Sequence, residues 1–302
     1  PTTSQSALTE EYNVSATAFT PGAWAAGTNF PTGLQDGAGA GSSTTAAIVY
    51  GFWDTAVSNK ANEYNGSSWT ATPVMNTARA VYQSGTGTST AALCASGTQY
   101  PSPATGATEK WDGSSWTTVT SMNTSHSNLT GGGVQTSAIY AIGGVTNAES
   151  YNGSTWTVET AAPSTAFGGK GFSGQSEISN IFYGIGATAT YSYNGSAWTD
   201  LGHTLVEGKT APAGGSQQGT ATAAIAAGGF NPTPAITTES QQYDGSAWAT
   251  APSLGTGRRG GAGAGSATSC LAVGGEEPAQ SNKTEEFTAG TTALNYKTIT
   301  TS

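Results

Sequence analysis

Charged residues are scarce in this sequence. Asp, Glu, Lys and Arg make up 9% of its 302 residues, whereas about a quarter is usual for a globular domain. The 18 acidic residues outnumber the 9 basic ones, so the net charge is −9. Because nucleic-acid binding depends on basic side chains that neutralise phosphates, this balance argues against a nucleic-acid partner. Scarce charge beside abundant Thr, Ser, Asn and Gly favours an extracellular or particle-surface protein.

Long apolar segments are also missing. No window of about 18 consecutive apolar residues occurs, so we expect no membrane insertion. No signal peptide is visible either. The sequence begins at Pro1 instead of Met, so we expect a processed chain or part of a longer one.

Few residues here are suited to metal binding or nucleophilic catalysis. Cys94 and Cys270 each lie in a short apolar run, so we expect buried free thiols rather than a disulfide. His126 and His203 lie nearly two repeats apart, which does not match clustered metal ligands. Gly171-Phe172-Ser173-Gly174 is one residue short of a nucleophile elbow. We predict no catalytic residues, no metal and no cofactor.

Aromatic residues, in contrast, recur in a fixed phrase. Tyr64-Asn65-Gly66-Ser67-Ser68-Trp69 is its first copy, and residues 111–116, 151–156, 193–198 and 243–248 repeat it. Asn-Gly and Asp-Gly favour type I′ turns, in which both central residues need positive φ. We therefore predict a tight hairpin in each copy, with its two aromatics in a structural core. These aromatics are Tyr64, Trp69, Trp111, Trp116, Tyr151, Trp156, Tyr193, Trp198, Tyr243 and Trp248.

The phrase belongs to a longer repeat. From Trp24 to Trp248, successive tryptophans of the series lie 40 to 50 residues apart, a period typical of propeller blades. Each period also holds a Gly-rich segment, an apolar segment such as Ala138–Gly144, and a variable loop. Four strands per period fit one blade, with the Gly-rich strand innermost, where backbones approach closely.

An apolar run into Gly-Gly, then Glu and an aromatic, then Asn/Asp-Gly and Trp, resembles the kelch repeat. The segments Pro73–Arg79 and Pro252–Arg258 resemble the kelch stretch that ends in Arg before the inner strand. The low charge and the motif Tyr-Asn-Gly-Ser-Ser-Trp-Thr also resemble those of kelch-type propellers in bacteriophage virion proteins. This resemblance implies a β-propeller fold.

We accordingly predict an all-β, six-bladed kelch-like β-propeller with four-stranded antiparallel blades, with seven blades as the alternative. Residues 1–8 are interpreted as a tail or linker, and residues 9–302 as one domain closed by its N- and C-terminal strands. Trp24 would then join the sheet of residues 260–288. One strand is surplus, because Glu11-Tyr12 and Glu286-Phe287 both fit the Glu-aromatic pattern. It would be a fifth strand or lie in a neighbouring subunit.

Two sets of residues are candidates for binding. Ten or eleven residues after each repeat Trp, the chain has Leu34, Arg79, His126, Phe167, Lys209 and Arg258. Equivalent positions form a ring in a propeller, so Arg79, His126, Lys209 and Arg258 could line a rim for an acidic or sugar ligand. The alternative is that they satisfy loop carbonyls between blades. The loops 53–61, 98–106 and 230–238 do not repeat, and form the second set.

The resulting functional hypothesis is a non-enzymatic structural or adhesion protein of a phage virion or cell surface, such as a tail fibre or capsid decoration. Its partners would be other virion or surface subunits in a homo-oligomer or assembly, with a host glycan as a further partner. A secreted carbohydrate-binding propeller is the alternative, and a galactose-oxidase-like enzyme comes third.

Overall fold

The computed structural model describes residues 16–82, 85–163, 171–176, 179–185, 188–215, 219–233 and 235–295. These ranges contain 28 β-strands and no α-helix. No helix within them is long and apolar enough to cross a bilayer. The predicted tail 1–8, the surplus pair Glu11-Tyr12 and the rim position Phe167 lie outside the described residues.

Four sheets of four antiparallel strands follow one another in chain order. The first consists of β3 (Ala38–Ser43), β4 (Ala46–Tyr50), β5 (Ala61–Tyr64) and β6 (Trp69–Ala71). The second consists of β7 (Thr86–Thr88), β8 (Ala91–Ala95), β9 (Thr108–Trp111) and β10 (Trp116–Val119). The third consists of β11 (Leu129–Val134), β12 (Ser137–Ile142), β13 (Ala148–Tyr151) and β14 (Trp156–Val158). The fourth consists of β15 (Gly171–Ser176), β16 (Ser179–Ile185), β17 (Ala189–Tyr193) and β18 (Trp198–Thr204).

A further, eight-stranded sheet combines two groups of four strands. One group is β19 (Gly214–Gly215), β20 (Ala224–Ala227), β21 (Ser240–Tyr243) and β22 (Trp248–Ala251). The other is β23 (Ala262–Ser266), β24 (Ser269–Val273), β27 (Thr284–Thr288) and β2 (Ala23–Ala26). A single pair, Gly214 opposite Ala272, connects the two groups. A small hairpin of β25 (Glu276–Glu277) and β26 (Ala279–Gln280) lies between β24 and β27.

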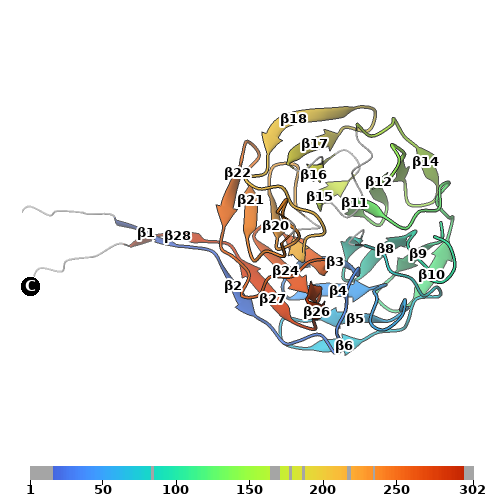
Figure 1. Ribbon diagram of the computed structural model, residues 1–302, viewed down its shortest axis with the longest axis horizontal. Helices are drawn as coiled ribbons and strands as arrows, with labels where there is room; N and C mark the ends of the chain where they lie inside the picture. Colours follow the sequence, from blue (N-terminus) through green and yellow to red (C-terminus); the bar gives the residue numbers. More distant parts are fainter. Residues whose placement is uncertain are drawn as a thin grey trace, which may run out of the picture.

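The sheets are arranged in a circle around their inner strands (Figure 1). Strand β3 contacts both β23 and β7, and β11 contacts both β7 and β15. Glycine makes this approach feasible, because a Cβ on Gly39 would lie 2.2 Å from the carbonyl oxygen of Gly263 in β23. A Cβ on Gly85 would lie equally close to the carbonyl oxygen of Gly39. The all-β architecture of four-stranded antiparallel sheets is that of a β-propeller.

The hydrophobic core is divided into clusters between neighbouring sheets. Tyr50 of β4 packs against Trp116 of β10 in the next sheet, with ring centroids 5.0 Å apart. Tyr183 of β16 packs in the same way on Trp248 of β22, at 4.8 Å. All ten repeat aromatics belong to or pack against such clusters. Aromatic rings contribute large buried areas, so each phrase helps to attach its sheet to a neighbour.

The hairpins of the repeat phrase differ from the predicted type I′ turn. Tyr64 lies directly opposite Trp69, so the loop has four residues rather than two. Only Gly66 has positive φ, at 90°. The Asn65 side-chain oxygen accepts hydrogen bonds from the backbone N–H groups of Ser67 and Ser68, both at 2.9 Å. This side-chain cap replaces the second positive-φ residue that a type I′ turn would require.

The two ends of the described chain form a two-stranded antiparallel ribbon of β1 (Ala16–Thr20) and β28 (Thr291–Asn295). The ribbon projects from the outer edge of the circle (Figure 1). Directly after β1, strand β2 pairs with β27, and Trp24 lies opposite Phe287. N-terminal and C-terminal segments thus share one sheet, and β1 pairs with β28.

Candidate functional site

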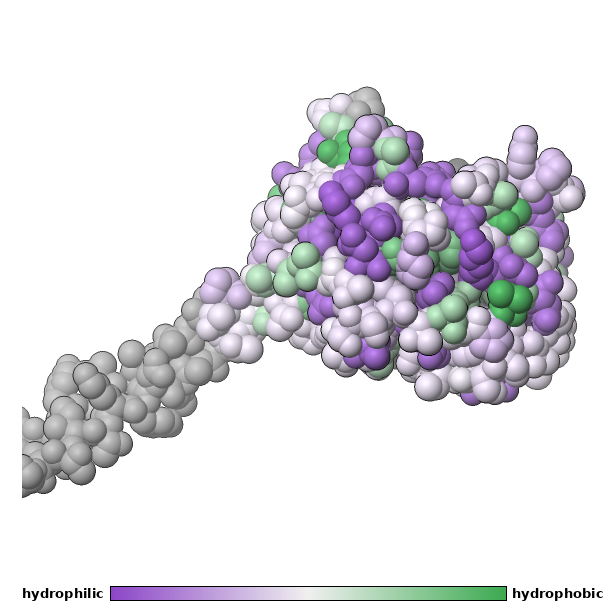
Figure 2. Space-filling model, turned by 90° about the horizontal axis from the view of Figure 1, so that it is seen from below, coloured by the Kyte–Doolittle hydropathy of each residue, from purple (hydrophilic) through white to green (hydrophobic). Residues whose placement is uncertain are grey.

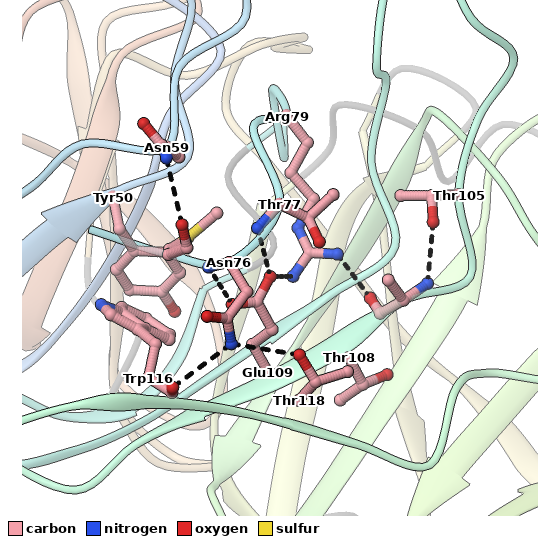
Figure 3. Close-up of polar contacts among 12 residues, drawn as sticks. Tyr50, Asn59, Asn76, Thr77, Arg79, Thr105, Thr108, Glu109, Trp116 and Thr118 are labelled. Carbon is pink, nitrogen blue, oxygen red and sulfur yellow. Dashed lines mark hydrogen bonds and ion pairs between the residues drawn. The ribbon is translucent and has the colours of Figure 1, made fainter.

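Arg79, a predicted rim residue, is completely buried. Its Nη2 donates to Glu109 Oε1 at 2.9 Å, and its Nη1 donates to the carbonyl oxygen of Ala107 at 2.7 Å (Figure 3). The same carboxylate accepts from the backbone N–H groups of Asn76 and Thr77. The guanidinium therefore fixes the loop before β7 to strand β9, and it does not reach solvent.

Arg258 repeats this arrangement in another sheet. It is also completely buried, and its Nη2 donates to Glu285 Oε1 at 2.8 Å. Its Nη1 donates to the carbonyl oxygens of Gly274 and Lys283. Desolvation lowers the pKa of the Arg258 guanidinium, although Glu285 opposes the shift. Both arginines satisfy loop carbonyls, as the alternative for this position predicts, but these carbonyls lie within the arginine's own group of four strands rather than between blades.

Lys209 is 3% exposed, and its Nζ lies 3.8 Å from a carboxylate oxygen of both Glu207 and Glu239. Burial lowers the pKa of its amine. The place taken by Glu109 and Glu285 in the other sheets is here filled by Gln241, which accepts from the backbone N–H of Val206. Lys209 is therefore buried beside carboxylates of its own group of strands.

His126 is half-buried, and its backbone N–H donates to Ser96 Oγ at 3.0 Å. The carboxylate of this repeat, Glu149, accepts from the N–H groups of Asn123 and Thr124 and from the Asn123 amide. Leu34, which occupies the equivalent position before β3, is completely buried. The structure thus does not bring the four predicted cationic side chains together at a surface.

A pocket of about 360 Å³ lies where the inner strands begin, beside these same loops. We call the face of the circle on which β3, β7, β11, β19 and β23 begin the mouth face. The residues that line this mouth pocket are Gln35, Asp36, Tyr82, Asn128, Thr210, Ala211, Arg259, Gly260 and Glu276. All except Glu276, which lies in β25, come from segments that precede five different inner strands, so the pocket is shared among sheets.

A chain of backbone hydrogen bonds connects the sheets around this pocket. Gly260 N–H donates to the carbonyl of Ala211 at 2.8 Å, Asp36 N–H to that of Gly260 at 2.6 Å, and Tyr82 N–H to that of Asp36 at 3.0 Å. All four residues have positive φ, between 46° and 62°. This conformation is uncommon for residues other than glycine. Because this conformation recurs before four inner strands, the segments around the mouth share one backbone conformation while their side chains differ.

Asp36 and Arg259 are the charged groups that enter the pocket with Glu276. Arg259 Nη2 lies 2.6 Å from Glu276 Oε2. The Asp36 carboxyl has no such cation at hydrogen-bonding distance, and Gln35 Nε2 donates to it at 3.4 Å. Burial raises the pKa of Asp36 to about 6, while Gln35 and Arg259 oppose the shift. A partly buried carboxyl therefore titrates near neutral pH beside the ion pair.

The loops predicted to vary all lie on the mouth face, because each follows the second strand of its sheet. Isolated antiparallel bridges attach them to the segments before the inner strands: Gln35 with Trp53, Ala80 with Thr98, and Thr210 with Phe230. Arg259 and Glu276 form an equivalent bridge in the last group of strands. Trp53 and Tyr100 meet between two loops, with ring centroids 5.8 Å apart. The Arg259 guanidinium lies 4.9 Å from the Phe230 ring centroid.

The remaining reactive residues lie elsewhere. His203 Nδ1 is 2.6 Å from the Tyr243 hydroxyl. Cys94 and Cys270 are free and buried, as predicted, and desolvation raises the pKa of Cys94 to about 11. Among the described ranges, no group of three or more His, Cys, Asp or Glu residues is placed to hold a metal ion.

Comparison with known proteins supports the fold and no particular family. No protein-family model matches the chain, and no curated protein matches it. The solved structure of YjhT is similar, with a TM-score of 0.65 and 12% sequence identity. The match covers 89% of this chain and 99% of YjhT. At this identity, the likeness supports a shared propeller-like architecture only.

Proposed function

We propose that this protein is a six-bladed, kelch-like propeller that serves as a non-enzymatic display module of a virion or cell surface. Six groups of four strands support the blade number, counting the eight-stranded sheet as two blades. The phrase that ends in Trp supplies one hairpin to five of these groups. In this proposal, the ribbon carries the propeller and the mouth face meets a partner or host.

The observation that carries the proposal is the position of the ribbon relative to the mouth pocket. Strand β23 begins beside the pocket and ends at residue 266, where a hairpin leads into β24. The register pairs Ser269 at the start of β24 with Thr288 at the end of β27. Thr288 in turn pairs with Ala23 at the start of β2. The ribbon therefore leaves this blade at the end opposite to the mouth.

Figure 1 shows the ribbon projecting away from the circle of sheets, next to β2 and β27. On the face shown in Figure 2, apolar residues are scattered and polar residues extend over much of the surface. A propeller held by such a ribbon would turn its variable loops outward. These loops carry the side chains that differ between the repeats, which is what recognition of a specific partner needs.

The proposal is tested by locating the protein in its source. Virions and washed cell envelopes would be purified on density gradients and analysed by quantitative mass spectrometry. We expect this chain to co-migrate with one of the two fractions and to be digested there by external protease. Presence only in the soluble fraction would contradict the proposal. Turnover by the purified protein of primary alcohols, the substrates of the oxidase alternative, would contradict its non-enzymatic part.

A further inference from the structure

We propose that the mouth face binds a neutral saccharide, with a pyranose ring packed against Trp53 and Tyr100 and its hydroxyl groups directed toward the mouth pocket. This inference rests on the proposed display function and names the chemical class of the ligand. It also separates two sets of aromatics in the molecule: those that hold blades together and a pair that is available for contact.

The first step is the exposure of the pair. Tyr100 is 65% exposed, whereas the repeat residues Trp116, Trp156 and Trp248 are 6 to 8% exposed. Its ring lies 5.8 Å from that of the half-buried Trp53, with 59° between the planes. The two rings thus form an apolar corner. Exposed aromatic rings offer apolar faces to the C–H groups of a sugar ring while leaving its hydroxyls free for hydrogen bonds.

The second step is that backbone hydrogen bonds hold both loops in place. Trp53 N–H donates to the carbonyl of Gln35 at 2.8 Å, and Gln35 N–H donates back at 2.9 Å. Thr98 and Ala80 exchange a similar pair at 2.9 and 3.0 Å. Tyr100 lies in a turn that is closed by a hydrogen bond from Ser102 N–H to the carbonyl of Gln99. A contact surface held in this way loses little conformational entropy when a ligand binds.

The third step is the position of the pair beside the mouth pocket. Gln35, which is bridged to Trp53, lines the pocket, as does Tyr82, two residues after the Ala80 bridge to the Tyr100 loop. Tyr82 N–H also donates to the carbonyl of Asp36, which ties the two segments together. The two loops that carry the aromatic corner are therefore attached to two segments that line the polar pocket, which places an apolar surface next to a few convergent polar groups.

The fourth step is charge, which decides between a neutral and an acidic sugar. The Arg259 cation in the pocket is already paired with Glu276 at 2.6 Å. Asp36 adds a further carboxyl, so the pocket has no surplus of positive charge. Arg79 and Arg258 are buried with their own carboxylates and cannot supply it. An anionic ligand would meet repulsion here, whereas Asn128, Gln35 and Asp36 can exchange hydrogen bonds with hydroxyl groups.

The test uses the purified full chain on a printed array of neutral and sialylated glycans, followed by calorimetry with the strongest neutral glycan. We expect neutral glycans to bind and sialylated forms to bind more weakly. Tyr100→Ala and Trp53→Ala should each weaken binding about tenfold, because each removes one wall of the corner. Val158→Ala, which truncates a 58% exposed side chain on β14, serves as the matched control and should bind as the wild type does.

Circular dichroism and a thermal melt would show that each variant is folded. Tyr100 is the decisive position, since its exposed side chain makes few core contacts. The inference is overturned if no neutral glycan binds, if sialylated glycans bind better, or if the folded Tyr100→Ala protein binds unchanged. None of these outcomes depends on the fractionation experiment, so a protein found on particles that ignores neutral glycans would leave the display function standing.

Discussion

The Nη2 atom of Arg79 lies 2.9 Å from Glu109 Oε1, and both side chains are fully buried. Glu109 also accepts two backbone N–H groups from the loop that begins at Asn76. A buried carboxylate with these partners connects the start of one blade to that blade's third strand. Arg258 and Glu285 form the same connection at 2.8 Å in the last blade.

We predict that Glu109→Ala will lower the free energy of unfolding by about 3–5 kcal/mol. The substitution leaves the Arg79 charge buried without its partner and also leaves two N–H groups unpaired. Urea denaturation followed by tryptophan fluorescence measures the effect.

The matched control is Lys60→Ala, which breaks the ion pair of Lys60 with Asp54 at 2.7 Å. The Lys60 side chain is 58% exposed, so this change should cost no more than about 1 kcal/mol. Equal losses for the two variants would mean that the buried connection does not stabilise the blade as we infer.

The repeat phrase made the strands predictable, because its five copies mark the same hairpin in each blade. The direction of the side chains at the predicted rim was harder to predict, because the position of Arg79 in the repeat does not show whether its side chain points inward. A signal did exist within the chain. Arg79 and Arg258 are each followed by a repeat that carries Glu109 or Glu285, while the repeat of Lys209 carries Gln241. The recurrence of Arg with Glu at equivalent positions in two repeats indicates contact between them.

The mouth pocket could not be predicted in the same way. Asp36, Tyr82, Ala211 and Gly260 share a backbone conformation and no chemical property, so no motif identifies them. Their contact depends on closure of the circle, which brings distant segments together. The sequence did indicate the non-repeating loops, and these loops carry Trp53 and Tyr100.

We predict that Asp36→Asn will increase stability at pH 7 and flatten its pH dependence. The pKa of Asp36 is about 6 in the folded protein, against a usual value of 3.8. The folded state therefore binds the proton more tightly, and Asp36 makes stability fall as pH rises from about 4 to 6. The difference between the folded and the usual pKa of Asp36 corresponds to at most about 3 kcal/mol of stability at pH 7.

Urea titrations at pH 4, 5, 6 and 7 would compare the wild type with Asp36→Asn. Asp200→Asn, at an exposed position on β18, controls for loss of a carboxylate. Arg259, Glu276 and Tyr82 face the same pocket and remain in both proteins. If the two variants show the same pH profile between pH 4 and 7, burial does not raise the Asp36 pKa.

Gly39→Ala should severely destabilise the protein. The new Cβ would lie 2.2 Å from the Gly263 carbonyl oxygen, and both atoms belong to rigid inner strands. We expect a loss of several kcal/mol, comparable to the largest costs of overpacking a core. Gly202→Ala is the control, because its Cβ would meet nothing within 4 Å although φ is 66°. That change should cost only about 1 kcal/mol of backbone strain. Similar melting temperatures for the two variants would contradict the close contact of β3 with β23.

Removal of residues 1–20 and removal of residues 1–26 should have different consequences. The shorter deletion removes β1 and leaves β2 paired with β27, so the melting temperature should change by only a few degrees. The longer deletion also removes β2, together with the Trp24 ring that packs 5.2 Å from Phe287. It exposes the edge of β27, and unpaired edges promote aggregation. We expect its melting temperature to fall by at least about 10 °C, with oligomers visible by light scattering. Identical melting curves would mean that β2 does not complete the last blade, and that the ribbon is not connected to the propeller through a structural strand.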